Sequence, residues 1–477
     1  MMNKRKKEYK LAKTALKEEY RRKLQELKLN QFQDVEYPEE ETVDILMEDG
    51  RIEWGKLDAT AHMYPIITSS GMSNVYRVFV TLKEEIQPNL LQKALDMVLP
   101  KFNLFNTRLR QGMFWYYFEE NGKPAPRVRK EVDYPCQYVD STRNKSYLFR
   151  VTYFQNRINL EVFHVLTDGM GAFNFLKELT YQYLRLIYPD LRDRLGDQLN
   201  AATSLETQDS FVEYYQKKEV KPYKFHKAYI LKGPELPKGQ LGVMHGYVSV
   251  AELKKVARAY GASINEYLVA AILYAVFCVY GNEMDLDKPL IACVPVNLRP
   301  FFHSVTTKNF FVNTSAIFSP RKREHSFEQV LSQVKASLQK QINKEYLLDN
   351  FSTNVSSEKN LILRSLPWIF KKIGLKMNYA SASKGNTLTI TNLGEIKVAE
   401  EYESYIERFN VVLTRSANQN LKVSLTTYKG ELAITISSVF KYTGIQKQFF
   451  RLLTKEGISV KLETNGVYSR RKYNEDM

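Results

Sequence analysis

Runs of alternating apolar and polar residues take turns with runs of helical spacing along the first half of the chain. Residues 75–82, 147–154 and 157–165 alternate as strands, and only two residues separate the last two runs, which predicts a hairpin. Residues 88–100 and 171–187 have apolar positions at helical spacing and end at a proline or just before one. Strands that alternate with helices predict an α/β fold.

A polar, irregular stretch with several lysines and prolines interrupts this pattern, and the pattern then restarts. We expect strands at 245–250, 289–300, 386–396, 409–415 and within a hairpin at 421–440, and helices at 251–261, 264–280, 325–342 and at the start of 445–462. The chain then divides into an extension and linker at 1–35, an N-terminal lobe at 36–195, a connection at 196–240 and a C-terminal lobe at 241–477.

Charge is concentrated at the N-terminus of this 477-residue chain. The net charge is +16, and residues 1–30 hold eleven Lys or Arg against four Glu, which leaves only +9 for the rest. A nucleic-acid partner is therefore not expected. The first 30 residues read as a basic amphipathic helix, which fits an anionic membrane or another protein, or else a solvated extension that packs on its own domain.

The remaining composition points to a cytoplasmic protein. Cys136, Cys278 and Cys293 are too few for a disulfide framework or a CxxC metal site. The longest apolar run, at 268–280, falls short of the ~20 residues that cross a bilayer. We expect a cytoplasmic location and leave open a peripheral position at the inner membrane surface.

The string His164-Val165-Leu166-Thr167-Asp168-Gly169 carries the clearest chemistry. It stands at the end of a strand and at the entry to a helix, where the strand would hold the imidazole and Gly169 would permit a tight turn. Histidine suits proton removal near neutral pH. The alternative is a histidine buried in the core without a chemical role.

No other catalytic pattern competes with it. The sequence has no GxSxG, GxxxxGK(S/T), GxGxxG or HExxH string, and its six histidines lack metal-ligand spacing. We therefore expect no hydrolase or NTPase chemistry, no metal and no bound cofactor.

This HxxxDG string resembles that of the chloramphenicol acetyltransferase-like and condensation-domain superfamily of CoA-dependent acyltransferases. Bacterial alcohol acetyltransferase-like proteins are the most similar group. Further segments match in the expected order, at 56–65, 91–110, 163–179, 263–273, 294–302 and 390–396. The resemblance implies two lobes, each a mixed β-sheet flanked by helices, with an active-site tunnel between them. This fold can complete its tunnel within one polypeptide, which is compatible with a monomer.

The resemblance also implies roles for particular residues. His164 would be the general base, and Asp168 would turn away and pair with an arginine, either Arg299 or Arg108. The strand ends with Asn297, Arg299, Thr391 and Asn392 would line the tunnel, where Thr391 or Asn392 could support the thioester oxyanion. For these strand ends, a purely structural role is the alternative.

The resemblance implies an acyltransferase that moves an acyl group from acyl-CoA, as co-substrate, or from an acyl carrier protein to a hydroxyl or amine. The acceptor would be a small alcohol, a lipid or a metabolite. Phe163 stands where peptide-condensing members carry a second His, and the DFGWG string of the plant enzymes is absent. Both differences favour a stand-alone enzyme. The alternative is a catalytically inactive protein of this fold that binds a membrane surface or a partner through its basic N-terminal helix.

Overall fold

The computed structural model describes residues 45–46, 52–58, 60–69, 71–194, 209–217, 227–304, 306–359 and 368–468. The chain divides into two compact units, Met1–Val43 and Asp44–Met477. The predicted N-terminal extension with its basic helix lies outside the described residues, and so do residues 196–208 and 218–226 of the predicted connection at 196–240. The lobe boundaries therefore stay a prediction.

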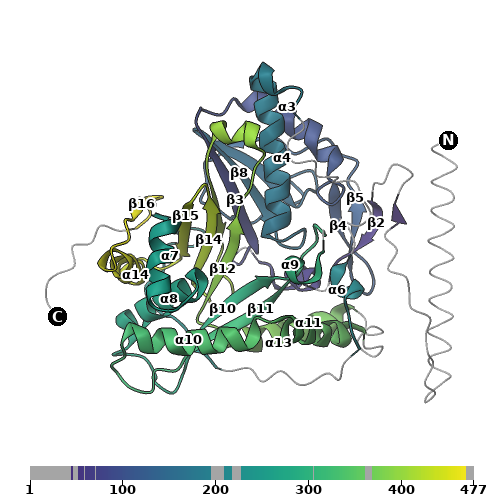
Figure 1. Ribbon diagram of the computed structural model, residues 1–477. Coiled ribbons are helices and arrows are strands. Elements are labelled where there is room, and N and C mark those ends of the chain that lie inside the picture. Colours follow the sequence, from purple (N-terminus) through teal and green to yellow (C-terminus); the bar gives the residue numbers. More distant parts are fainter. Residues whose placement is uncertain are drawn as a thin grey trace, which may run out of the picture. The chain divides into compact units, whose positions relative to one another are not determined.

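The first lobe is built on a five-stranded sheet in the order β13-β3-β8-β7-β6. Its strands are β3 (Val75–Leu82), β6 (Arg129–Lys130), β7 (Phe149–Phe154), β8 (Arg157–Phe163) and β13 (Ile406–Leu413). The predicted hairpin is confirmed, because β7 and β8 pair antiparallel. Helices α3 (Pro88–Val98) and α4 (Gly169–Ile187) pack with each other beside this sheet (Figure 1).

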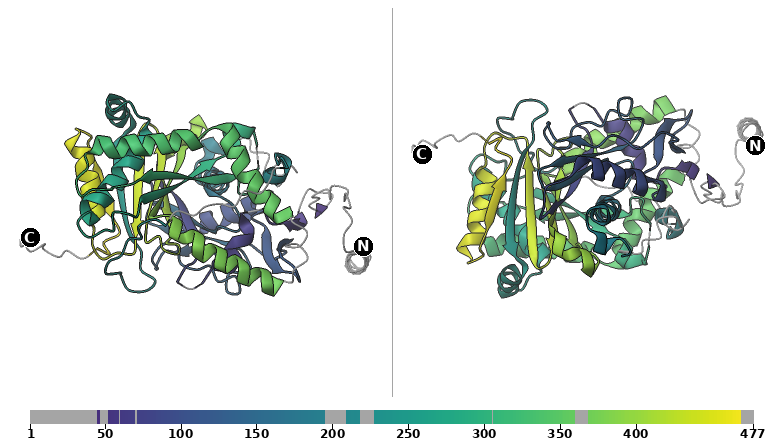
Figure 2. Two further views of the ribbon diagram at one scale, coloured as in Figure 1. Left: turned by 90° about the horizontal axis from the view of Figure 1, so that it is seen from below. Right: turned by 90° about the horizontal axis from the view of Figure 1, so that it is seen from above.

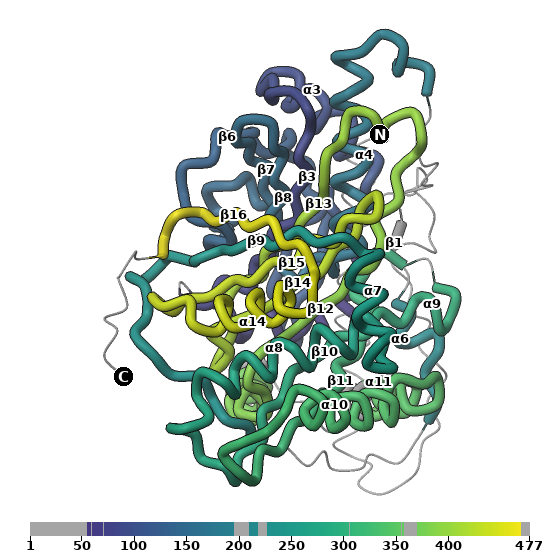
Figure 3. The backbone as a smooth tube through the Cα atoms, turned by 60° about the vertical axis from the view of Figure 1, so that its left-hand side comes forward, coloured from purple at the N-terminus to yellow at the C-terminus, as the bar shows by residue number. Residues whose placement is uncertain are grey.

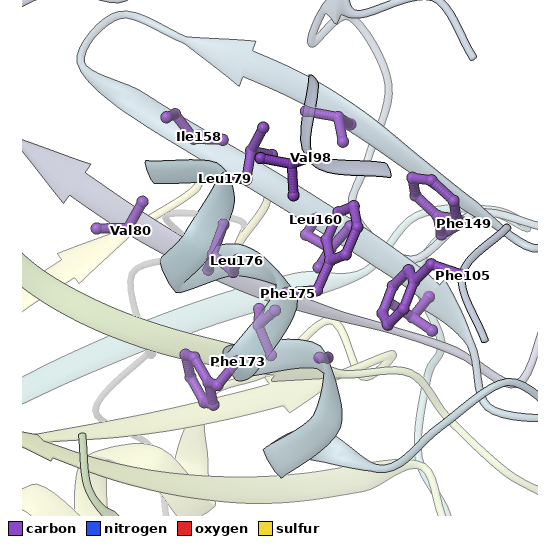
Figure 4. Packing of buried hydrophobic residues seen from close by; sticks show 14 of the residues in the cluster. Val80, Val98, Phe105, Phe149, Ile158, Leu160, Phe173, Phe175, Leu176 and Leu179 are labelled. Atoms are coloured by element: carbon purple, nitrogen blue, oxygen red, sulfur yellow. The ribbon is translucent and has the colours of Figure 1, made fainter. Parts of the chain in front are cut away.

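The alternation of β8 explains how this lobe buries its core. Ile158 and Leu160 point to the same side and meet apolar side chains of α4, among them Phe175 (Figure 4). The rings of Phe105 and Phe175 stack with their centroids 4.1 Å apart. This packing fixes the end of β8 relative to the start of α4, and the HxxxDG string lies at that junction.

The second lobe is built on a seven-stranded mixed sheet in the order β11-β10-β12-β14-β15-β9-β16. Its strands are β9 (Gly242–Ser249), β10 (Leu290–Asn297), β11 (Phe311–Phe318), β12 (Leu388–Glu395), β14 (Leu421–Tyr428), β15 (Glu431–Ser438) and β16 (Lys461–Thr464). Figure 3 shows the yellow β16 beside the teal β9, although the two are far apart in sequence.

Helices bury the apolar face of this sheet. They are α7 (Val250–Ala259), α8 (Ile264–Tyr280), α10 (Phe327–Gln341) and α14 (Gly444–Lys455). Both views of Figure 2 show the yellow α14 on the side that faces away from the purple and blue strands of the first lobe. The capping box predicted at Ser263 and Glu266 is confirmed at the start of α8.

The opposite face of the sheet is polar and meets β13. Ser424 of β14 donates a hydrogen bond to the Val411 carbonyl at 2.7 Å, and Thr426 donates to the Phe409 carbonyl at 2.9 Å. β13 itself pairs with β3 of the first lobe. Residues 406–413 were predicted within the C-terminal lobe, whereas their strand joins the sheet of the first lobe. Strand pairing between distant segments depends on topology, which local patterns do not carry.

Smaller elements complete the two lobes. A four-stranded sheet consists of β1 (Ile45–Leu46), β2 (Ile52–Lys56), β4 (Thr107–Gln111) and β5 (Tyr116–Glu120). Among the described residues, the remaining helices are η1 (Ala61–Met63), α2 (Tyr64–Ile67), η2 (Leu99–Lys101), η3 (Pro189–Leu191), α6 (Ser210–Glu213), α9 (Arg299–Phe302), α11 (Lys344–Lys359), α13 (Trp368–Ala382), η4 (Ser383–Gly385) and η5 (Glu400–Tyr405). The sequence patterns did not predict α11 or α13.

Among the described helices, no single one is long and apolar enough to cross a bilayer. α7 and α8 meet the length and composition only when taken together, and they are bent by 80° at their junction.

Candidate active site

His164 follows the last residue of β8 and is held between aromatic rings. Its amide donates a hydrogen bond to the Asn74 carbonyl at 3.0 Å. Its ring stacks on Tyr64 with centroids 4.5 Å apart, and Tyr76 lies at 4.9 Å. The Tyr76 hydroxyl donates to the Asp168 carbonyl at 2.7 Å, so the same ring also fixes the following turn. The imidazole is therefore oriented from two sides.

The surroundings of His164 keep its ring neutral. Burial lowers its pKa from 6.5 to about 4; its own carbonyl, Asp168 and Asn309 oppose this change, whereas the positive charge of Lys422 adds to it. The nitrogen Nδ1 is buried and makes no hydrogen bond of normal geometry, whereas Nε2 is not among the buried unpartnered atoms. The residue as a whole is partly exposed.

Asp168 turns its carboxylate away from the imidazole. Its Oδ1 caps α4 by accepting from the amides of Met170 and Gly171 at 3.1 and 3.2 Å. Its Oδ2 accepts from Arg299 at 2.8 Å and from the Phe310 amide at 3.1 Å. The structure thus joins Asp168 to Arg299.

Arg108, the other candidate partner, lies elsewhere. It belongs to β4 and forms its ion pair with Glu119 at 2.9 Å. A hydrogen bond between neighbouring strands of the four-stranded sheet explains its position without reference to Asp168.

Arg299 braces the loop that follows β10. Besides Asp168, its guanidinium donates to the carbonyls of Thr306 and Lys308 at 2.9 and 2.8 Å. Asn297 accepts from the Arg299 amide at 3.1 Å and from its guanidinium at 3.2 Å. Both residues are therefore engaged in holding the backbone near the HxxxDG string.

Two glycines allow the lobes to meet at this string. A Cβ atom on Gly169 would lie 2.8 Å from Leu393 Cδ2, at the end of β12. A Cβ atom on Gly171 would lie 2.6 Å from the Thr307 carbonyl oxygen, which also accepts from Thr167. Gly169 was expected to provide a tight turn, but it begins α4 without a positive φ, and the close approach of Leu393 is what leaves no room for a side chain.

Thr391 and Asn392 lie on β12 in different settings. Asn392 is exposed, and its Oδ1 accepts from the Gly394 amide at 2.9 Å in a local turn. Thr391 is partly buried on the same face of the strand as Thr389. In the register of the sheet, Thr389 stands between Cys293 of β10 and Lys422 of β14. Burial lowers the pKa of Lys422 to about 8.

Asp58 and Asn309 belong to the site although the sequence patterns did not single them out. Asn309 Nδ2 donates to Asp58 at 2.8 Å and lies 3.5 Å from the His164 carbonyl oxygen. Asp58 is fully buried, and burial together with the charge of Asp209 raises its pKa to about 7. Asp58 stands in the segment 56–65, whose resemblance was noted, and that segment was the available signal.

A separate cavity of about 180 Å³ lies at the other end of α4, between Tyr183, Tyr188 and Tyr405. It does not include any residue of the HxxxDG string.

No protein-family model matches the chain, and no curated protein matches it in sequence. Solved structures do match it. TRI101 of F. sporotrichioides, in complex with coenzyme A and T-2, matches with a TM-score of 0.57 at 10% identity. This match covers 86% of the present chain and 99% of TRI101. The trichothecene 15-O-acetyltransferase TRI3 of Fusarium sporotrichioides matches with a TM-score of 0.55 at 11% identity. This match covers 84% of the present chain and 94% of TRI3.

A third match extends the likeness beyond the trichothecene proteins. The first condensation domain of the calcium-dependent antibiotic synthetase has a TM-score of 0.52 at 13% identity and covers 84% of this chain and 95% of its own. At these identities the likeness concerns the fold. The chain therefore has the two-lobed α/β fold of the chloramphenicol acetyltransferase-like and condensation-domain superfamily.

Proposed function

We propose that the protein is an acyltransferase that moves an acyl group from acyl-CoA, or from an acyl carrier protein, to a hydroxyl or amine, with His164 as general base. The observation that carries this proposal is the setting of His164, with Nδ1 buried and the ring fixed by Tyr64 and Tyr76 at the end of β8. Its position at the junction of two lobes supports a tunnel through which donor and acceptor enter from opposite ends.

In the proposed reaction, His164 Nε2 takes the proton of the acceptor hydroxyl while the oxygen attacks the thioester carbonyl carbon. The tetrahedral intermediate then collapses, the carbon–sulfur bond breaks, and the imidazolium returns the proton to the departing thiolate. The lowered pKa of His164, about 4, favours the second proton transfer, whereas a weaker base takes the acceptor proton less readily. The same lowered pKa keeps the base neutral at pH 7 and makes the imidazolium acidic enough to protonate a thiolate, whose conjugate thiol has a pKa of about 8.5.

The other residues act on position and charge. Asp168 and Arg299 hold the turn after His164, and they are positioning residues in this proposal. The Thr391 hydroxyl is our candidate donor for the thioester oxyanion, because Thr391 is partly buried whereas the Asn392 side chain is exposed and used in its own turn. Coenzyme A is bound by TRI101, and this supports acyl-CoA as the co-substrate here.

The test is release of free CoA by the full chain from acyl-CoA in the presence of alcohols, amines and lipids. His164→Ala should lower the rate by about 10²–10⁴-fold, the usual worth of a general base. His325→Ala is the matched control, since His325 lies at the start of α10, and its rate should match that of the unsubstituted chain. Both variants should keep their far-ultraviolet circular dichroism. Full turnover by His164→Ala would refute the assignment.

A further inference from the structure

Helix α13 presents an apolar face outward. Phe370, Ile373 and Met377 follow one another at helical spacing and are 62%, 55% and 69% exposed. Helices on the surface of water-soluble domains normally turn polar residues outward. This face is therefore the reverse of the usual arrangement and needs a partner that accepts apolar side chains.

The inward face of α13 is already occupied. Leu375 and Tyr379 pack on Ile66 and Ile67 of α2. Since these two residues lie one turn apart on the opposite side of the helix from Ile373 and Met377, the outward apolar face is not a shifted part of the core. It is a second, separate apolar surface.

Positive charge borders the outward face. Lys372 and Lys376 are exposed on one flank, and neither has an ion-pair partner among the described residues. Lys371, on the other flank, lies 3.9 Å above the Trp115 ring. The helix contains no acidic residue. Apolar residues bordered by lysines fit a surface that is itself apolar inside and negative outside, such as an anionic lipid bilayer.

A second apolar element lies beside the helix. Phe114 and Trp115 belong to the loop between β4 and β5 and contact Lys371 of α13. Their neighbour Met113 is 72% exposed. We propose that α13 and the tip of this loop, residues 112–115, together form a docking surface for an anionic membrane, with Phe370, Ile373, Met377 and Met113 entering the interface and the lysines contacting lipid phosphates.

Helix α13 carries the docking surface on its outward side, and its inward side packs next to the candidate active site. Tyr379 and Leu375 of α13 pack in the same apolar cluster as Tyr64, whose ring stacks on His164. The proposal does not depend on what His164 does, because it rests on the outward face alone. Its experiment therefore measures membrane contact and not acyl transfer.

The first experiment reports contact at α13 itself. In the full chain with Cys278→Ser, Met377→Cys is labelled with an environment-sensitive NBD fluorophore; the remaining cysteines, Cys136 and Cys293, are buried. Vesicles of phosphatidylcholine and phosphatidylglycerol should shift its emission to the blue, and vesicles of phosphatidylcholine alone should do so much less. The control label at Val132→Cys, which is 86% exposed, should not respond.

Three outcomes would overturn the proposal. The label at 377 could remain in water while the protein sediments with the vesicles, so that another segment binds. It could shift without lipid as the protein concentration rises, so that a second copy covers α13. It could shift on addition of a protein partner and not of vesicles.

A second experiment tests the lysines. Lys372→Gln with Lys376→Gln should lower the affinity for anionic vesicles by about 30-fold, because each lysine near such a surface is worth ~1 kcal/mol. Lys254→Gln with Lys255→Gln, on the exposed side of α7, removes the same charge elsewhere and should change the affinity little. An equal loss in both pairs would show that net charge alone attracts the protein, and would contradict docking through α13.

Discussion

The ion pair between Arg299 and Asp168 joins the two lobes beside His164, and Arg299→Ala should destabilise the fold strongly. The two side chains are 14% and 9% exposed, so the carboxylate left behind would remain buried. Breaking such a pair costs about 3–5 kcal/mol. The variant also removes the donors to the carbonyls of Thr306 and Lys308. We therefore expect the free energy of unfolding to fall by about 3–5 kcal/mol.

Arg108→Ala is the matched control. Arg108 also pairs with a carboxylate, that of Glu119, but the two side chains are 28% and 23% exposed. Glu119 keeps a second arginine, Arg110, at 2.8 Å. An ion pair in contact with solvent is worth about 0–1 kcal/mol, so this variant should cost no more than that.

Urea unfolding, followed by circular dichroism and tryptophan fluorescence, gives the free energy of unfolding of both variants. The slope m should be the same in the variants and the unsubstituted chain. A double-mutant cycle with Asp168→Asn isolates the pair: once Asp168 is neutral, Arg299→Ala should cost clearly less than it does in the unsubstituted chain. Equal costs for Arg299→Ala and Arg108→Ala, or a cycle without coupling, would refute the reasoning.

Two further predictions concern stability. Gly171→Ala should destabilise the fold by at least ~1–3 kcal/mol, because its Cβ would clash with Thr167 Oγ1 and would lie 2.6 Å from the Thr307 carbonyl oxygen. Gly374→Ala, whose Cβ would have no atom within 4 Å, should stabilise α13 by about 0.5–1 kcal/mol. Urea midpoints of the two variants that move in the same direction would contradict this. Burial lowers the pKa values of His62, His164 and His245 from 6.5, so between pH 5 and 6 the unfolded chain binds more protons at these residues. The raised pKa of Asp58 acts in the opposite direction and offsets about one of these protons. From pH 5 to pH 6 the free energy of unfolding should therefore rise by about 2 kcal/mol, visible as a higher urea midpoint at pH 6. A flat or falling midpoint would argue against neutral buried histidines.

The local part of the candidate site could be predicted from the sequence. The hairpin of β7 and β8, the position of His164 directly after β8 and the helix after Asp168 all follow from alternation, helical spacing and turn residues within a few positions. The resemblance carried by the HxxxDG string added the two-lobed fold, which the solved structures confirm.

The distant part could not be predicted. Two arginines were equal candidates for Asp168, and Arg299 stands 131 positions away from it in the chain. Asn309 reaches Asp58 across 251 positions. No pattern within a short window reports such contacts, because they depend on which strands pair and which loops the pairing brings together. The reason for Gly169 was equally invisible, since it lies in the approach of Leu393 from the other lobe.

The α/β order of elements, the imidazole at a strand end and the basic character of residues 1–30 follow from local sequence patterns. The crossing of β13 to the first sheet, the contacts of Arg299 with the turn after His164 and the outward apolar face of α13 depend on tertiary contacts. Local periodicity tells which face of an element is apolar. Whether that face is buried or exposed depends on the neighbours that the whole chain supplies.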